Sequence, residues 1–239
     1  MDIAEVWAAY MSVLQDRAPV TAASVRPPRP ATDLEAAERA TTPWTAELRE
    51  FFSLHDGQHI PVGVDYHVGT LLPDLELLTL DGVHYEHQSH LEMLHSIEDL
   101  GEEWPAAIKT QRAGETAYKF LAPYVPFGRD GSTGSCYVDT RDGPQRGCVR
   151  FFAADAADEG QPAFDSLTDY LDSIRRSVQQ GTQHSSLIPT VRDGALVLGL
   201  GLGLATTRRI AAAAGPATPI SANRFSPVAG VGHRRPVGP

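Results

Sequence analysis

The chain has 239 residues, of which 42% are hydrophobic and 21% charged, so it has enough apolar residues to form a hydrophobic core. This length fits either one large domain or one compact domain with extensions. Residues 1–180 hold 14 basic and 29 acidic residues, a net charge of −15, whereas the part from 181 onward has six arginines and one aspartate. A strongly acidic body repels nucleic acid and membrane surfaces and attracts basic partners. Direct binding to nucleic acid or to a membrane is therefore not expected.

The N-terminus, "MDIAEVWAAY", carries Asp2 and Glu5 where a secretory signal needs positive charge, and no apolar signal segment follows. The longest apolar run, 195–205, is shorter than the roughly 20 residues that span a bilayer. The two cysteines, Cys136 and Cys148, are too few for a disulfide framework, so we expect buried thiols. These features predict a cytoplasmic protein.

Hydrophobic spacing predicts three helices in the first 55 residues. Apolar residues at steps of three and four predict an amphipathic helix over 3–14, with Trp7 on its buried face. After the proline-rich stretch 25–33, Thr32 or Asp33 can cap a second, short helix. Pro43 starts a third, whose apolar face holds Trp44, Leu48, Phe51 and Phe52.

The third helix runs into His55, Asp56 and Gly57, which raises the question of a catalytic pair. A His–Asp dyad needs a nucleophile or a metal nearby, and the sequence supplies none. Gly57 provides the left-handed residue that commonly follows a helix, and His55 suits the negative end of the helix dipole. The pattern therefore predicts a helix end.

The second half of the chain mixes strands and helices. A short strand is predicted near Leu75–Leu80, followed by a helix with Val83, Leu91, Leu94 and Ile97 on its apolar side. Turn-rich segments divide 120–152 into an antiparallel meander of at least three strands. A last helix starts at the cap Ser166, with Asp169 at the capping-box position, and its buried stripe is Leu167, Tyr170, Leu171, Ile174 and Val178.

From 181 the composition changes to alternating Leu and Gly and then to small residues with proline. This part offers little to bury, so the domain is predicted to cover 1–180 and 181–239 to be a mostly disordered, low-complexity tail. A strand over 195–204 stays open, although Gly at every second position weakens it.

Histidines are concentrated in one region, because seven of the nine lie between 55 and 95. On a helix, His87 and His90 can point to one side and bind a metal with Glu86, but His84 and His95 cannot both join them. The HExxH spacing of zinc proteases is absent, which favours a polar, solvated and His-rich helix face. No nucleotide-binding or nucleophile motif occurs, so no cofactor is expected.

The order of several stretches resembles the SMI1/KNR4 family (SUKH superfamily), especially its actinobacterial-type members. The most specific of these are "FFSLHDGQ" and "FGRDGSTGSCYVD…GCVRFF", and the resemblance covers about 1–178. Where the family usually shows Leu-Pro, this chain has Pro43-Trp44. The resemblance implies an α+β domain with a mixed or largely antiparallel sheet, flanked by N-terminal helices and closed by a C-terminal helix. It carries over no catalytic residues.

The resemblance implies a non-enzymatic protein-binding module, most concretely an immunity-type protein that binds and neutralises a toxin. The acidic body fits a basic partner such as a nuclease toxin. Two alternatives are a regulatory scaffold in cell-wall assembly or signalling and a metal-dependent enzyme using the histidines of 84–95. The predicted partner contacts are Asp81, Glu86, Glu92, Glu98, Asp99, Glu102, Glu103 and Trp104.

Overall fold

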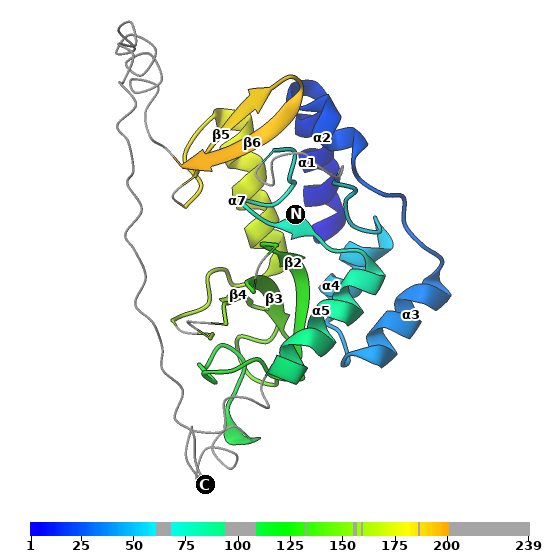
Figure 1. The fold of residues 1–239 in the computed structure, drawn as a ribbon, viewed down its shortest axis with the longest axis vertical. Coiled ribbons are helices and arrows are strands. Elements are labelled where there is room, and N and C mark those ends of the chain that lie inside the picture. The colour runs from blue at the N-terminus through cyan, green and yellow to red at the C-terminus, as the bar shows by residue number, and fades with distance from the viewer. Residues whose placement is uncertain are drawn as a thin grey trace, which may run out of the picture. The chain divides into compact units, whose positions relative to one another are not determined.

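The computed structural model describes residues 1–60, 68–93, 109–131, 133–154, 157–158, 160–185 and 187–200. All of them belong to one compact unit, which runs from Met1 to Gly201 (Figure 1). Cys136 and Cys148 are buried free thiols, as predicted. Within the described ranges, no helix combines the length and the apolar composition that a membrane span requires.

The unit mixes helices with two antiparallel sheets, which confirms the predicted α+β class. The helices are α1 (Ile3–Arg17), α2 (Pro19–Ala23), α3 (Ala31–Ala40), α4 (Ala46–Ser53), α5 (Leu80–Met93) and α7 (Leu167–Gln180). The larger sheet has the order β1-β2-β3-β4 and contains β1 (Glu76–Leu77), β2 (Tyr124–Arg129), β3 (Ser135–Asp139) and β4 (Val149–Phe152). The smaller sheet pairs β5 (Leu187–Arg192) with β6 (Ala195–Leu200).

Helices α1 and α7 lie against each other and bury their predicted apolar stripes (Figure 1). Helix α1 begins with a reciprocal capping box between Asp2 and Glu5. Helix α7 begins at Ser166, whose hydroxyl accepts from the Asp169 N–H, and ends at Gly181, whose φ of 67° is left-handed. Sequence-local signals therefore fixed both ends of the helix that closes the domain.

The larger sheet separates two hydrophobic cores, because successive side chains of a strand point to opposite faces. On the β3 strand, Cys136 and Val138 belong to the main core, which the helical layer of α1, α4 and α7 shares. Tyr137 lies between them and belongs to a smaller core with Phe120, Tyr124 and Phe152 on the other face. The predicted three-stranded meander is thus confirmed, and β1 adds a fourth strand at its edge.

Two helix starts differ from the sequence prediction. Pro30 occupies the N-cap of α3 and no side chain caps that helix, so neither Thr32 nor Asp33 is its cap. Helix α4 starts later than Trp44, because the Thr45 hydroxyl accepts from the Leu48 N–H and defines the N-cap. Trp44 is still buried, and it packs on Phe52 from the preceding loop.

The compact unit continues beyond the predicted domain boundary at 180, as far as Gly201. Strands β5 and β6 form a hairpin around Asp193 and Gly194, which both have a positive φ. The hairpin is bonded to the domain, since the Leu196 N–H donates to the Thr21 hydroxyl. Its buried side chains extend the main core: Leu187, Leu196 and Leu198. Residues 202–239 of the predicted tail lie outside the described residues.

Candidate functional site

The histidine-rich helix α5 turns part of its polar sequence inward. Glu86, His87 and His90 are 8%, 1% and 2% exposed, so the predicted solvated face is wrong for these three residues. With Val83 they follow the spacing i, i+3, i+4 and i+7, which defines one face of a helix. Val83 is apolar and lies on the same side of the helix, so its position could have indicated that this face is buried. The sequence prediction counted only apolar residues and therefore missed the other three.

Glu86 and His90 meet Ser135 of β3, and the trio contains the residue types of a hydrolase triad. The Ser135 hydroxyl donates to Glu86 Oε1 over 2.7 Å, and His90 Nε2 lies 2.7 Å from the same hydroxyl. Glu86 Oε1 also lies 3.2 Å from His90 Nε2. In a triad the carboxylate holds one ring nitrogen while the other receives the serine proton. Here both partners lie on Nε2, so the three side chains do not have the arrangement of a triad.

The trio is instead a hydrogen-bonded polar contact within the core. Burial raises the pKa of Glu86, but hydrogen bonds from His90 and Ser135 outweigh it and bring that pKa below its ordinary value. Because the serine donates to Glu86, the His90 Nε2 must carry its proton and Nδ1 is left without a partner. His90 packs on Phe120 and Phe152, so the ring ties α5 to the smaller core.

His87 has a comparable structural role. Its Nε2 donates to the Ala122 carbonyl over 2.8 Å, and burial lowers its pKa. His84 is exposed on the same helix, and His95 lies outside the described residues. Within the described part of the chain, no three His, Cys, Asp or Glu side chains gather in an arrangement that could hold a metal. Instead, His87 and His90 both pack against Phe120.

His55 and Asp56 form a structural junction after α4. The Gly57 N–H donates to His55 Nδ1, and the His55 ring packs on Trp7 and Phe51 at centroid distances of 4.5 and 4.3 Å. Burial lowers the pKa of His55 to about 3, so it carries no charge for the helix dipole, contrary to the prediction. Asp56 accepts from the Leu80 N–H and so holds the first turn of α5.

The following residues complete this junction. The Asp56 N–H donates to the Arg26 carbonyl, and the Arg26 N–H donates to the Gly57 carbonyl. The Gln58 amide oxygen accepts from the Leu71 N–H, and its nitrogen donates to the Ser24 hydroxyl. The stretch "HDGQ" therefore connects segments that are distant in sequence. A helix does end just before this stretch, as predicted, but α4 stops at Ser53 with Leu54 as its C-cap, so the left-handed Gly57 belongs to the junction and not to the helix terminus.

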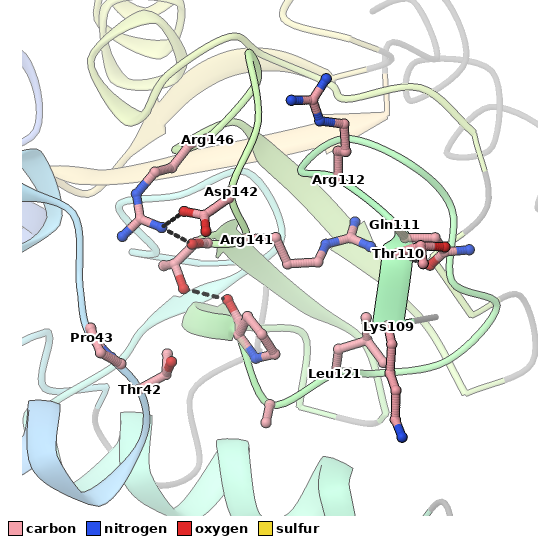
Figure 2. A pocket seen from close by; sticks show the side chains of 13 residues that line it. Thr42, Pro43, Lys109, Thr110, Gln111, Arg112, Leu121, Arg141, Asp142 and Arg146 are labelled. Carbon is pink, nitrogen blue, oxygen red and sulfur yellow. Dashed lines mark hydrogen bonds and ion pairs between the residues drawn. The ribbon is translucent and has the colours of Figure 1, made fainter. Parts of the chain in front are cut away.

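A pocket of about 720 Å³ lies beside the end of β3 (Figure 2). Four cations and one carboxylate line it: Lys109, Arg112, Arg141, Arg146 and Asp142. Figure 2 shows Lys109 and Arg112 extending in opposite directions, while Arg146 turns back to Asp142 at 3.4 Å. The cations therefore do not converge on one point where a single anion could bind them all.

The remaining cation of the pocket, Arg141, is used by the protein itself. Its Nη2 pairs with Asp139 at 2.7 Å, and further bonds reach the Glu115 carbonyl and Gln111. A second buried pair stands next to it, because Asp158 accepts from the backbone of 117 and 118 and faces Arg150 at 4.0 Å. These carboxylates brace the loop 111–118 and are occupied by protein donors.

The predicted partner contacts fall into three groups. Asp81 and Glu92 are exposed on α5, as a contact surface requires. Glu86 is buried under the helix and cannot touch a partner, so its prediction as a contact is wrong. The others lie outside the described residues: Glu98, Asp99, Glu102, Glu103 and Trp104.

The fold and its pockets define a class: an α+β domain with an antiparallel sheet, in which the described polar clusters serve the fold. The chain belongs to the SMI1 / KNR4 family (SUKH-1), whose model matches residues 33–173. Members of this family are in general non-catalytic, protein-interaction or immunity-type modules. The matched range begins in α3 and ends in α7, and it contains the stretch "HDGQ" and the larger sheet. A search of curated proteins finds no match.

Proposed function

We propose that this chain is an immunity-type protein that binds a toxin in the cytoplasm and neutralises it by occlusion. The observation that carries the proposal is the charge of the body, a net of −15 over residues 1–180. Within the described residues, burial removes little of it: Glu86, Asp139 and Asp158 are buried, and so are Arg141 and Arg150. Taking away three negative and two positive charges leaves a net of −14.

An excess of negative charge of this size favours association with a basic protein, because it attracts such a protein as the two approach each other and repels nucleic acid. A toxin that cleaves nucleic acid has to be basic around its active site, since it neutralises phosphates. An acidic protein seated there competes with the substrate for the same charges. Occlusion of this kind needs no chemistry from the immunity protein.

Co-expression tests the proposal. The toxin domain encoded beside the gene for this chain is expressed in a sensitive host, alone and together with the chain. We expect growth to be restored and the two proteins to elute as one complex at micromolar concentration. Continued toxicity, together with separate elution of the two proteins, would refute the immunity role.

A further inference from the structure

The outer face of α5 carries an exposed stripe opposite the buried Glu86, His87 and His90. Asp81, Tyr85, Gln88 and Glu92 follow the spacing i, i+4, i+7 and i+11, which places them along one side of a helix. Three of them are exposed and Gln88 is half-buried. Helix α5 thus has a packed face and a largely exposed face, which α3 meets at one edge, where Gln88 donates to the Ala40 carbonyl and Asp81 binds Arg29.

Tyr85 stands in the middle of this stripe and is 65% exposed, more than Tyr118 at 48% or Phe151 at 46%. An exposed tyrosine offers a large contact area at low cost in side-chain entropy, and such residues dominate the energetics of interfaces. It lies one helical turn from Asp81 along the stripe. The stripe therefore combines an aromatic anchor with negative charge.

A recess of about 200 Å³ adjoins the stripe between α3 and α5. Alanines of α3 line it, and the Asp33 and Asp81 carboxylates stand beside them. Arg29 already binds both carboxylates over 2.9 Å, which shows that the two acids can hold a guanidinium. Asp81 remains 86% exposed, so a second cation can reach it.

Apart from Arg29, which the recess already contains, the segment that carries the stripe has charges of one sign. Residues 50–108, which include α5, contain twelve Asp or Glu residues and no Lys or Arg. A basic partner that contacts this segment is therefore not repelled by any Lys or Arg side chain of the segment. The aliphatic stem of a lysine or arginine can lie on the alanines while its charged end reaches Asp81.

We propose that the face of α5 formed by Asp81, Tyr85, Gln88 and Glu92, together with the recess beside α3, binds a lysine- or arginine-rich surface of another protein. The inference deepens the proposed function, on which it rests, because it names the docking face and the chemistry of the partner. The occupant is a separate basic protein. The chain's own arginine-containing segment 202–239 is the competing occupant that the experiment has to exclude.

Site-specific photocrosslinking in the native host tests the proposal without knowledge of the partner. The full chain carries p-benzoylphenylalanine in place of Tyr85 or, as a matched control, in place of the exposed Tyr118. We expect a basic protein to crosslink at position 85 and not at position 118. No adduct, the same adduct at both positions, an acidic adduct or an internal link to 202–239 would each overturn the proposal.

The crosslinked protein is then purified and its affinity for the full chain measured. We expect Tyr85→Ala and Glu92→Lys each to weaken binding about tenfold or more, and binding to fall with added salt. Asp16→Lys changes an exposed carboxylate on α1 and should weaken binding by less than about threefold. Equal effects of all three substitutions would contradict the assigned face.

The two proposals fail in different ways. If the basic protein bound at Tyr85 is harmless to the host, the docking face stands and the immunity role is wrong. If a toxin is neutralised but the Tyr85 and Glu92 variants bind it as tightly as the native chain does, the immunity role stands and the face is wrong.

Discussion

His55 is a titratable side chain enclosed by aromatic rings. Its pKa is lowered from 6.5 to about 3 by burial, so the folded protein keeps the ring neutral where the unfolded chain takes up a proton. Stability from this group is therefore complete above about pH 6.5 and is lost as the pH falls from there toward 3. The loss is about 1 kcal/mol for each pH unit in that window.

The substitution His55→Asn removes this titration and keeps an acceptor for the Gly57 N–H, because an amide oxygen can take the place of Nδ1. At pH 7 the variant should be less stable by about 2 kcal/mol, since the smaller side chain leaves a void beside Trp7 and Phe51. Between pH 7 and 5 the native chain should lose about 2 kcal/mol more than the variant. Urea unfolding at a series of pH values measures both, and parallel curves would disprove the assignment.

Asp158 is a buried carboxylate, and its replacement should lower the free energy of unfolding strongly although few atoms change. It is fully buried and accepts from two backbone N–H groups and the Tyr124 hydroxyl opposite Arg150. Asp158→Asn leaves the Arg150 charge without its partner and should lower the free energy of unfolding by about 3 kcal/mol or more. Asp142→Asn, at an exposed carboxylate in the neighbouring turn, should change it by less than about 0.5 kcal/mol. Similar losses in thermal or urea unfolding would rule out the bracing role.

The limits of sequence prediction are also visible at single residues. Burial of Glu86 and His90 depends on Ser135, which is 49 positions from Glu86 and meets it only when α5 packs on the sheet. The helical phase of Val83 indicated their face, but the partner that makes burial of a charged group tolerable was not visible in the sequence. His55 was misjudged for the same reason, because Trp7 reaches it from a distant helix.

At the scale of elements, the junction at Gly57 joins α4 to β1 and α5. Its φ of 70° is left-handed, and a Cβ there would overlap the Leu78 carbonyl. Gly181, at the end of α7, has nearly the same φ of 67°, but a Cβ added to it would meet no atom within 4 Å. The two glycines share one conformation and differ in the space around them.

This pair yields a matched test. Gly181→Ala should lower the free energy of unfolding by about 1 kcal/mol, the usual penalty of the left-handed region for a residue with a Cβ. Gly57→Ala pays the same penalty and must also displace the backbone of 78–79, so its loss should be at least about twice as large. Equal losses in denaturant unfolding would mean that the close approach of Gly57 to Leu78 adds nothing to the destabilisation caused by the alanine.

Elements with strong local signals were predictable from the sequence. Helices α1 and α7 combine caps with apolar stripes, and the meander of β2, β3 and β4 is marked by its turns. The β5–β6 hairpin was not recognised, although Asp193-Gly194 is a common hairpin turn. Gly at every second position suggested that a strand here would be unstable. The hairpin is stabilised by Leu196 and Leu198, which pack on residues far away in the chain.

At the scale of the whole molecule, the hairpin is part of the domain even though the family match ends at 173. It covers the main core with Leu187, Leu196 and Leu198, which are 6%, 0% and 1% exposed. It also bonds to the N-terminal part, since Val20 N–H donates to the Gly194 carbonyl and Gly69 N–H to the Leu196 carbonyl. Removing it exposes apolar surface and leaves these donors without partners.

Two truncations separate the hairpin from the segment that follows it. A chain ending at Gln180 loses the three buried leucine side chains, each worth roughly 1.5–3 kcal/mol of burial, which approaches the total stability of a typical domain. It should therefore be largely unfolded at about 37 °C or aggregate. A chain ending at Gly201 retains the compact unit and should unfold within a few degrees of the full chain in circular dichroism. If the chain ending at Gln180 unfolded as cooperatively and at the same temperature, the hairpin would be an accessory to a domain complete at 180.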